Sequence, residues 1–187
     1  MEVIGLFIHA IEHGSYSNGP GRRIVVWTQG CSIRCEGCWN PETHDAGGTF
    51  LTRDKLLEYL LAGDFEGVTF SGGEPFDQGD AVLKIARSIR DLGFSCIAFS
   101  GFTLGVLENR YSRDALDSSF DALLTDPYKG SSNYNTVEDA LTNKTVTFLN
   151  QRYGLVDFNS LPEVEVIVDN HGEIRTTGLA APYFRQT

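Results

Sequence analysis

The sequence lacks three features that would place the protein in a membrane, outside the cell or on a nucleic acid. No apolar run is long enough to span a bilayer. No charged and then apolar leader opens the chain, because Glu2, His9 and Glu12 interrupt the first apolar stretch. Positive charge is scarce, with 15 Lys and Arg against 25 Asp and Glu for a net charge of −10, whereas nucleic-acid binding needs a basic surface. We therefore expect a soluble cytoplasmic protein, with no membrane and no nucleic acid among its partners.

Cysteine is also rare, but three of the four cysteines lie together in one glycine-flanked loop, at Cys31, Cys35 and Cys38. This spacing gathers three thiolates around one point and supplies no fourth. A [4Fe–4S] cluster normally takes one cysteine on each of its four irons. Three cysteines would leave one iron with an open position, and an open position at a metal is where chemistry can occur.

Two other interpretations of this loop remain open. The three cysteines could hold a structural zinc ion together with His44, as a Cys3His site. They could also form one disulfide and leave one free thiol, although a chain without a secretory signal favours metal binding over disulfides. The fourth cysteine, Cys96, lies in the middle of an expected strand and is interpreted as a small buried apolar residue.

The rest of the chain alternates expected strands and helices. Short β-branched or aromatic runs at 24–28, 68–70, 96–99 and 122–124 predict strands. Helices are expected after Thr52, over about 78–92 with a stripe of apolar residues, and from about Thr103. This alternation predicts βαβ units and a mostly parallel sheet. A full eight-fold barrel needs about 250 residues, so 187 residues predict an α/β fold with a partial, open βα barrel.

A second motif, Ser71-Gly72-Gly73-Glu74-Pro75, follows the expected strand 68–70. Two glycines let the backbone turn sharply and approach a ligand without an intervening Cβ atom. Backbone groups and the Glu74 carboxylate could then accept hydrogen bonds from an ammonium group. Taken alone, the motif is more typical of a tight turn between a strand and a helix.

Together, the cysteine loop and the Gly-Gly-Glu motif resemble those of radical S-adenosylmethionine (SAM) enzymes. The resemblance covers about residues 14–133 and implies a single radical SAM domain over 1–187, with additional strands at about 144–178. It implies a [4Fe–4S] cluster held by Cys31, Cys35 and Cys38, and SAM as the second cofactor. The residues it implies for SAM binding are Asn40, Ser71, Gly72, Gly73, Glu74, Pro75 and Ser100.

Three further segments resemble those of glycyl-radical activating enzymes, and most of all the activating enzyme of anaerobic ribonucleoside-triphosphate reductase. These are the Gly-Pro-Gly-Arg segment at 19–22, Ser-Gly-Phe-Thr-Leu at 100–104, and the stretch 121–133 that ends in Gly-Ser-Ser-Asn. The chain departs from that enzyme at Thr125-Asp126, where Asp-Gly is usual, and at Tyr134, where Gln is usual.

The resemblance implies reductive cleavage of SAM to a 5′-deoxyadenosyl radical, which would install a glycyl radical on a partner such as a reductase. A flavodoxin- or ferredoxin-type protein would donate the electron. An enzyme acting directly on a small molecule or a peptide is the alternative, with the divergent segment 125–143 as its substrate wall. A small zinc or electron-transfer protein is a third interpretation, but it leaves the Gly-Gly-Glu motif without a role.

The last third of the chain has a different pattern. Alternating or apolar runs at 145–149 and 164–168 predict strands, and 173–177 could pair with the second of them across a polar turn at 169–172. We expect these strands to complete the sheet or to pack beside it. Between them, the segment 127–143 is rich in Gly, Ser, Asn and Lys, and it is interpreted as a long functional or mobile loop.

Overall fold

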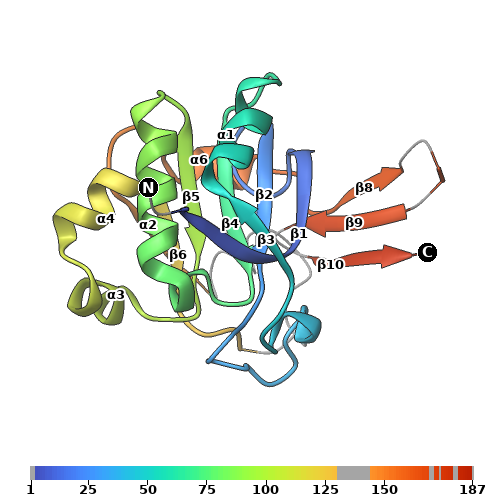
Figure 1. Ribbon diagram of the computed structural model, residues 1–187, viewed down its shortest axis with the longest axis horizontal. Coiled ribbons are helices and arrows are strands. Elements are labelled where there is room, and N and C mark those ends of the chain that lie inside the picture. The colour runs from blue at the N-terminus through green and yellow to red at the C-terminus, as the bar shows by residue number, and fades with distance from the viewer. Residues whose placement is uncertain (1–2, 130–143, 169–170, 173, 179–180, 187) are drawn as a thin grey trace.

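The structure is a computed structural model that describes residues 3–129, 144–168, 171–172, 174–178 and 181–186. Its largest element is a seven-stranded sheet in the order β3-β1-β2-β4-β5-β6-β7 (Figure 1). The strands are β1 (Gly5–Ser15), β2 (Arg23–Thr28), β3 (Thr49–Thr52), β4 (Gly67–Gly72), β5 (Ser95–Phe99), β6 (Ala122–Thr125) and β7 (Thr145–Phe148). The described helices are α1 (Arg53–Leu61), α2 (Gly79–Asp91), α3 (Leu104–Arg110), α4 (Arg113–Ser119) and α6 (Leu155–Asn159), with short 3-10 helices η1 (Pro41–Thr43) and η2 (Pro75–Gln78).

The centre of the sheet is parallel and its flanks are antiparallel. β2, β4, β5 and β6 run in one direction, as the alternating pattern predicted. β1 pairs antiparallel with both β2 and β3, and β7 pairs antiparallel with β6. The sheet does not close on itself, since β3 and β7 are its two edges. The α/β fold class with a partial, open barrel is therefore confirmed, with more antiparallel pairing at the flanks than the sequence indicated.

The two faces of the sheet bury different sets of side chains. Successive residues of a strand point to opposite faces, and on β5 Cys96 and Ala98 face the main core whereas Ile97 faces a smaller one. The main core lies under α1, α2 and α4, which cover the face turned toward the viewer in Figure 1. The smaller core on the opposite face includes Phe158 of α6.

Helix boundaries follow the signals in the sequence. The Thr52 hydroxyl accepts a hydrogen bond from the backbone amide of Lys55 and so caps α1, as expected from its position. The apolar stripe predicted for the helix over 78–92 is buried along α2. In α1, Leu56 and Leu60 are buried, whereas Leu61 lies on the solvent side of the helix and is 62% exposed.

The C-terminal strands divide between two sheets. β7 completes the large sheet, whereas β8 (Glu165–Val168), β9 (Ile174–Gly178) and β10 (Ala181–Gln186) form a separate three-stranded sheet beside β1 (Figure 1). β8 and β9 pair antiparallel, which confirms the expected pairing of these two segments. Residues 169–170 of the expected turn and residues 130–143 of the expected loop, including Gly-Ser-Ser-Asn, lie outside the described residues. The interpretation of 1–187 as a single radical SAM domain stays a prediction.

The Gly-Pro-Gly-Arg segment covers a buried guanidinium. Arg23, which follows this segment, is fully buried and donates to the carbonyl of Pro20 (2.9 Å), to Thr69 Oγ1 (2.7 Å) and to Ser95 Oγ (2.7 Å). Its side chain therefore joins the segment and β2 to two further parallel strands, β4 and β5. Within the described part of the chain, no helix combines the length and apolar content that crossing a membrane requires.

Candidate functional site

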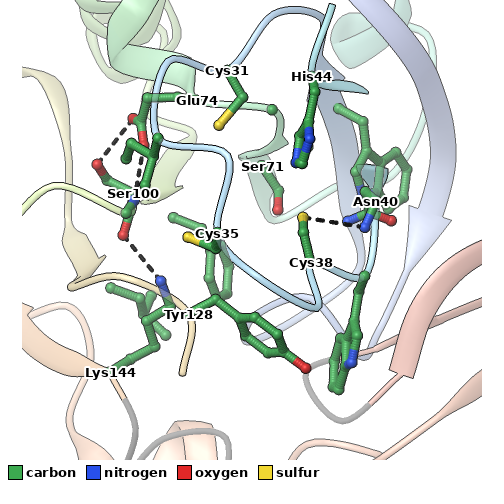
Figure 2. A pocket seen from close by; sticks show the side chains of 18 of the residues that line it. Cys31, Cys35, Cys38, Asn40, His44, Ser71, Glu74, Ser100, Tyr128 and Lys144 are labelled. Atoms are coloured by element: carbon green, nitrogen blue, oxygen red, sulfur yellow. Dashed lines mark hydrogen bonds between the residues drawn. The ribbon is translucent and has the colours of Figure 1, made fainter. Parts of the chain in front are cut away.

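The carboxyl ends of the parallel strands surround one pocket of about 170 Å³. The pocket lies on the face of the sheet opposite α1, α2 and α4. Its lining residues come from β2, the cysteine loop, β4, β5, β6 and β9, and Figure 2 shows their side chains turned toward one another. They are Asn18, Trp27, Cys31, Ile33, Cys35, Cys38, Trp39, Asn40, His44, Ser71, Gly72, Gly73, Glu74, Phe99, Ser100, Gly101, Leu124, Tyr128, Lys144, Thr177 and Gly178. The pocket therefore stands where α/β barrels build their active sites.

The cysteine loop is anchored to the η1 segment and to η2. Its start is fixed by hydrogen bonds from the amides of Gly30 to Thr43 O (2.8 Å) and of Cys31 to His44 O (3.1 Å). Asp77 accepts from both the amide (2.6 Å) and the hydroxyl (2.8 Å) of Ser32. These contacts place the loop independently of any ligand.

The three thiols of this loop are half-buried and line the pocket together. Burial raises the pKa of the Cys31 and Cys38 thiols, so a positively charged metal is needed to favour their ionised form. Among the described residues no three His, Cys, Asp or Glu side chains form a group that could hold a single metal ion. A [4Fe–4S] cluster does not require the three thiols to meet at one metal ion, because each cysteine binds a different iron.

The two glycines of the second motif are required by the cysteine loop itself. Gly73 N donates to Thr28 O and Glu74 N donates to Gly30 O, both at 2.9 Å. A Cβ atom on Gly73 would lie 2.2 Å from the carbonyl oxygen of Gly30. Gly72 has φ of +95°, a conformation that favours glycine. The backbone of this motif therefore packs directly against the strand and loop that carry the cysteines.

Glu74 joins the ends of β4 and β5. Its carboxylate is 1% exposed, and Oε1 accepts from the amide of Phe76 (3.0 Å) and the hydroxyl of Ser100 (2.9 Å). Oε2 accepts from the amide of Gly101 (2.8 Å). Burial raises the pKa of Glu74, and these three donors offset part of that effect. Two carboxylate oxygens offer about four acceptor positions, so one position on Oε2 remains for a donor in the pocket.

Two buried polar atoms in the pocket wall have no hydrogen-bond partner among the described residues. They are Oδ1 of Asn40 and Nε2 of His44. An unsatisfied buried polar atom costs about 1–3 kcal/mol, so a ligand with polar groups would be stabilised by reaching them. Figure 2 shows both side chains beside Cys38, whose Sγ accepts from the Asn40 amide at 3.4 Å. The residues present fit a polar, metal-containing ligand.

Most residues that the sequence indicated come together here. The three cysteines, Asn40, Ser71, Gly72, Gly73, Glu74 and Ser100 all line the pocket. Pro75 is instead buried at the first position of η2, behind Glu74. Cys96 is fully buried in the core, as expected for a small apolar residue, and its burial raises the pKa of its thiol to about 12.

Sequence analysis missed Lys144, Thr177 and Gly178 among the lining residues, and it included Tyr128 only as part of the segment 125–143, the substrate wall of the alternative interpretation. Tyr128 packs its ring 5.5 Å from that of Trp39 and closes one side of the pocket. Tyr128 follows β6, and its place near the end of a parallel strand could have marked it as a lining residue. Lys144 precedes β7 by one residue and carried no comparable signal.

Residues 17–147 match a sequence model of the family described as the 4Fe-4S single cluster domain. The pyruvate formate-lyase-activating enzyme of Clostridium pasteurianum is 40% identical over 109 residues, which are 54% of this chain and 46% of that protein. The pyruvate formate-lyase 1-activating enzyme of Escherichia coli K12 is 34% identical over 110 residues, 54% of this chain and 44% of that protein. The chain thus spans less than half the length of either curated relative.

Among solved structures, QueE from Escherichia coli aligns with a TM-score of 0.46 and 17% identity, over 53% of this chain and 54% of that one. The family match covers most of the chain, and it contains all three clustered cysteines, the Gly-Gly-Glu motif and Ser100. The chain therefore belongs to the family of 4Fe–4S single cluster domains, of the radical SAM type whose cofactors are a [4Fe–4S] cluster and SAM.

Proposed function

We propose that Cys31, Cys35 and Cys38 hold a [4Fe–4S] cluster whose fourth iron is left open for SAM. The observation that carries this proposal is that the three thiols share one pocket with the Gly-Gly-Glu backbone and its clamped carboxylate. When bound, the cluster and SAM supply the reaction of this class, the one-electron cleavage of a SAM carbon–sulfur bond that gives methionine and a 5′-deoxyadenosyl radical. The protein supplies binding, orientation and exclusion of water.

The residues of the pocket wall have separate parts in this proposal. The free acceptor position on Glu74 and the unpartnered Asn40 Oδ1 are suited to the ammonium group of an amino acid, which only donates hydrogen bonds. Trp27, Phe99 and Leu124 form an apolar floor that keeps water from the reacting atoms. Ser71, Gly72, Gly73 and Ser100 would bind the remainder of SAM, and Pro75 would hold the turn that presents Glu74.

We further propose that the radical acceptor is a glycine of a glycyl-radical protein. Both curated relatives are named as activating enzymes of pyruvate formate-lyase. The segments 19–22 and 100–104 favour an anaerobic ribonucleotide reductase as the partner, so a reductase-like and a lyase-like partner are the two candidates. A flavodoxin- or ferredoxin-type protein is the proposed electron donor.

The first experiment tests the cluster and SAM cleavage. The protein is reconstituted anaerobically with iron and sulfide, reduced with dithionite and given SAM, and 5′-deoxyadenosine is measured beside the EPR spectrum. We expect product and a SAM-perturbed spectrum from the wild type and from Cys96→Ala, and neither from Cys35→Ala. A Cys35→Ala protein that keeps the cluster and the product would contradict the ligand assignment. Zinc without iron would favour the structural-metal interpretation.

The second experiment tests the acceptor. The reduced protein and SAM are mixed with a reductase-type or a lyase-type glycyl-radical protein, and the glycyl radical is measured by EPR. We expect a radical on one of the two, and its loss when the acceptor glycine is replaced by alanine. SAM cleavage without a protein radical in either mixture would instead favour a small molecule or a peptide as substrate.

A further inference from the structure

One cation faces the pocket. Of the described lining residues, Lys144 is the single one with a Lys or Arg side chain. It lies immediately before β7, at the end of the segment that follows β6. Figure 2 shows its ammonium group turned toward Ser100, to whose backbone oxygen it is joined by a dashed line.

Two backbone carbonyls fix the position of this ammonium group. Lys144 Nζ donates to the carbonyl oxygen of Ser100 at 3.0 Å and to that of Asp126. These carbonyls follow β5 and β6, so the side chain ties the ends of two parallel strands to the start of β7. An ammonium has three donors, and the third is left for the pocket.

The surroundings of Lys144 are acidic. Burial lowers the pKa of its ammonium, and the neighbouring Glu74, Cys35, Asp126 and Cys38 side chains oppose that effect. Two of these four neighbours are proposed cluster ligands. Lys144 and the three cysteines are partly buried, and charges in a partly buried site interact more strongly than they would on the surface.

We propose that Lys144 is a positioning residue whose fixed positive charge makes the cluster held by Cys31, Cys35 and Cys38 easier to reduce. The inference rests on the cluster ligation proposed above, but not on the identity of the partner. Iron–sulfur potentials depend on net charge, on hydrogen bonds and on solvent exposure. Reduction adds one electron from an external donor, so a nearby cation stabilises the reduced state more than the oxidised state.

The test compares three substitutions of the reconstituted protein. Lys144→Arg keeps the charge, Lys144→Gln removes the charge but keeps an amide donor for the carbonyls of Ser100 and Asp126, and Lys144→Met removes both. The measurement is the midpoint potential of the cluster from an EPR-monitored redox titration without SAM, with iron and sulfide content determined on each sample.

We expect Lys144→Gln and Lys144→Met to make the one-electron reduction about tenfold less favourable, which is a shift of about 59 mV to more negative potential. Lys144→Arg should stay near the wild-type value. A wild-type potential in Lys144→Gln beside a shifted one in Lys144→Met would overturn the proposal, because the side chain would then act only as a clamp. Loss of the cluster from both neutral variants, with retention in Lys144→Arg, would also overturn it, because the positive charge would then serve to hold the cluster and not to set its potential.

Failure of this inference can be told apart from failure of the proposed function. A wild-type protein that holds no cluster would disprove the ligation itself, and this result is obtained before any variant is made. A wild-type protein that holds the cluster but does not cleave SAM would disprove the enzymatic proposal and leave the comparison of potentials valid. Equal potentials in the wild type and in both neutral variants would disprove only the role of Lys144.

Discussion

At the scale of single residues, Glu74 shows how a residue from a ligand-binding motif also supports the fold. Its carboxylate accepts three hydrogen bonds from Phe76, Ser100 and Gly101. It therefore fixes the turn after β4 against the end of β5 before any ligand enters. These three hydrogen bonds leave the side chain little freedom. They therefore also fix the position of its remaining acceptor site, on Oε2.

Replacing Glu74 by Gln should destabilise the protein although the two side chains have the same shape. One carboxylate oxygen becomes an NH2 group, which faces a backbone amide or a hydroxyl that needs an acceptor. An unsatisfied buried donor costs about 1–3 kcal/mol, and we expect this loss in the free energy of unfolding measured with urea. Glu58→Gln is the matched control, because Glu58 is exposed and pairs with the exposed Lys55; its effect should stay within about 0.5 kcal/mol. Equal losses of unfolding free energy in the two variants would contradict the role of the Glu74 carboxylate in fixing the turn after β4.

Cys96 should be chemically inert in the native protein. Its thiol is fully buried and has a pKa of about 12, whereas alkylation needs an accessible thiolate. Iodoacetamide applied to metal-free protein at pH 8 should label Cys31, Cys35 and Cys38 and spare Cys96, as read by peptide mass spectrometry. In urea all four should react. Early labelling of Cys96 without denaturant would show that the β5 core opens readily.

The site residues that belong to a local sequence motif could be predicted from the sequence. The three cysteines and the Gly-Gly-Glu motif lie in short stretches whose spacing alone brings them together. Lys144 could not be found in this way, because the long connection from β6 brings it to the pocket and only the β6–β7 pairing sets where it arrives. The acceptor groups that satisfy its ammonium are backbone carbonyls, which have no sequence signature.

At the scale of elements, the turn after β4 depends on its close approach to the cysteine loop. Gly73→Ala would place a Cβ atom 2.2 Å from Gly30 O, and the partner atom is backbone rather than a flexible side chain. We expect the end of β4 to move away from the loop, with a loss of about 1–3 kcal/mol in unfolding free energy and a lower iron content after reconstitution.

Gly105→Ala is the control for Gly73→Ala. Gly105 lies on the exposed side of α3, and a Cβ atom there would meet nothing within 4 Å. Alanine in a helix is favoured over glycine by up to about 1 kcal/mol, so this variant should be as stable as the wild type or more stable. Normal iron content in both variants would show that the loop tolerates the displacement.

Elements with strong local signals were predictable, and those defined by pairing were not. The cap at Thr52 and the buried stripe of α2 are local, and both were found in the sequence. β3 is a short strand that forms only by pairing with β1, more than 40 positions earlier in the chain, and the weakly patterned β10 forms by pairing with the neighbouring β9. The antiparallel direction of β1 is likewise set by tertiary contacts and not by local sequence, since the alternation of its side chains is the same in either direction.

At the scale of the whole molecule, the two sheets meet at a small buried polar cluster. Asn18 donates from Nδ2 to Thr177 Oγ1 (2.9 Å) and to Ser15 Oγ (2.8 Å), and Ser17 Oγ donates to Thr177 O (3.3 Å). Asn18 and Thr177 also line the pocket. The three-stranded sheet therefore contributes one wall of the site. Sequence analysis expected β8 and β9 but not this role, because the contacts join residues that are about 160 positions apart.

Thr177→Val tests whether this junction holds the small sheet against the site. Valine keeps the β-branched shape and removes only the hydroxyl that accepts from Asn18. The amide of Asn18 keeps Ser15 as a partner, so the loss in stability should be about 1 kcal/mol, the usual net value of one hydrogen bond. The effect should be local: hydrogen exchange of β9 amides should accelerate, whereas that of β2 and β4 should not, because local opening in a protein follows contiguous units.

Thr49→Val, at an exposed position of edge strand β3, should leave exchange at β9 unchanged. If exchange accelerated equally in β9 and β4, the two sheets would open as one unit, and the small sheet would then be an integral part of the pocket rather than a wall attached at one junction.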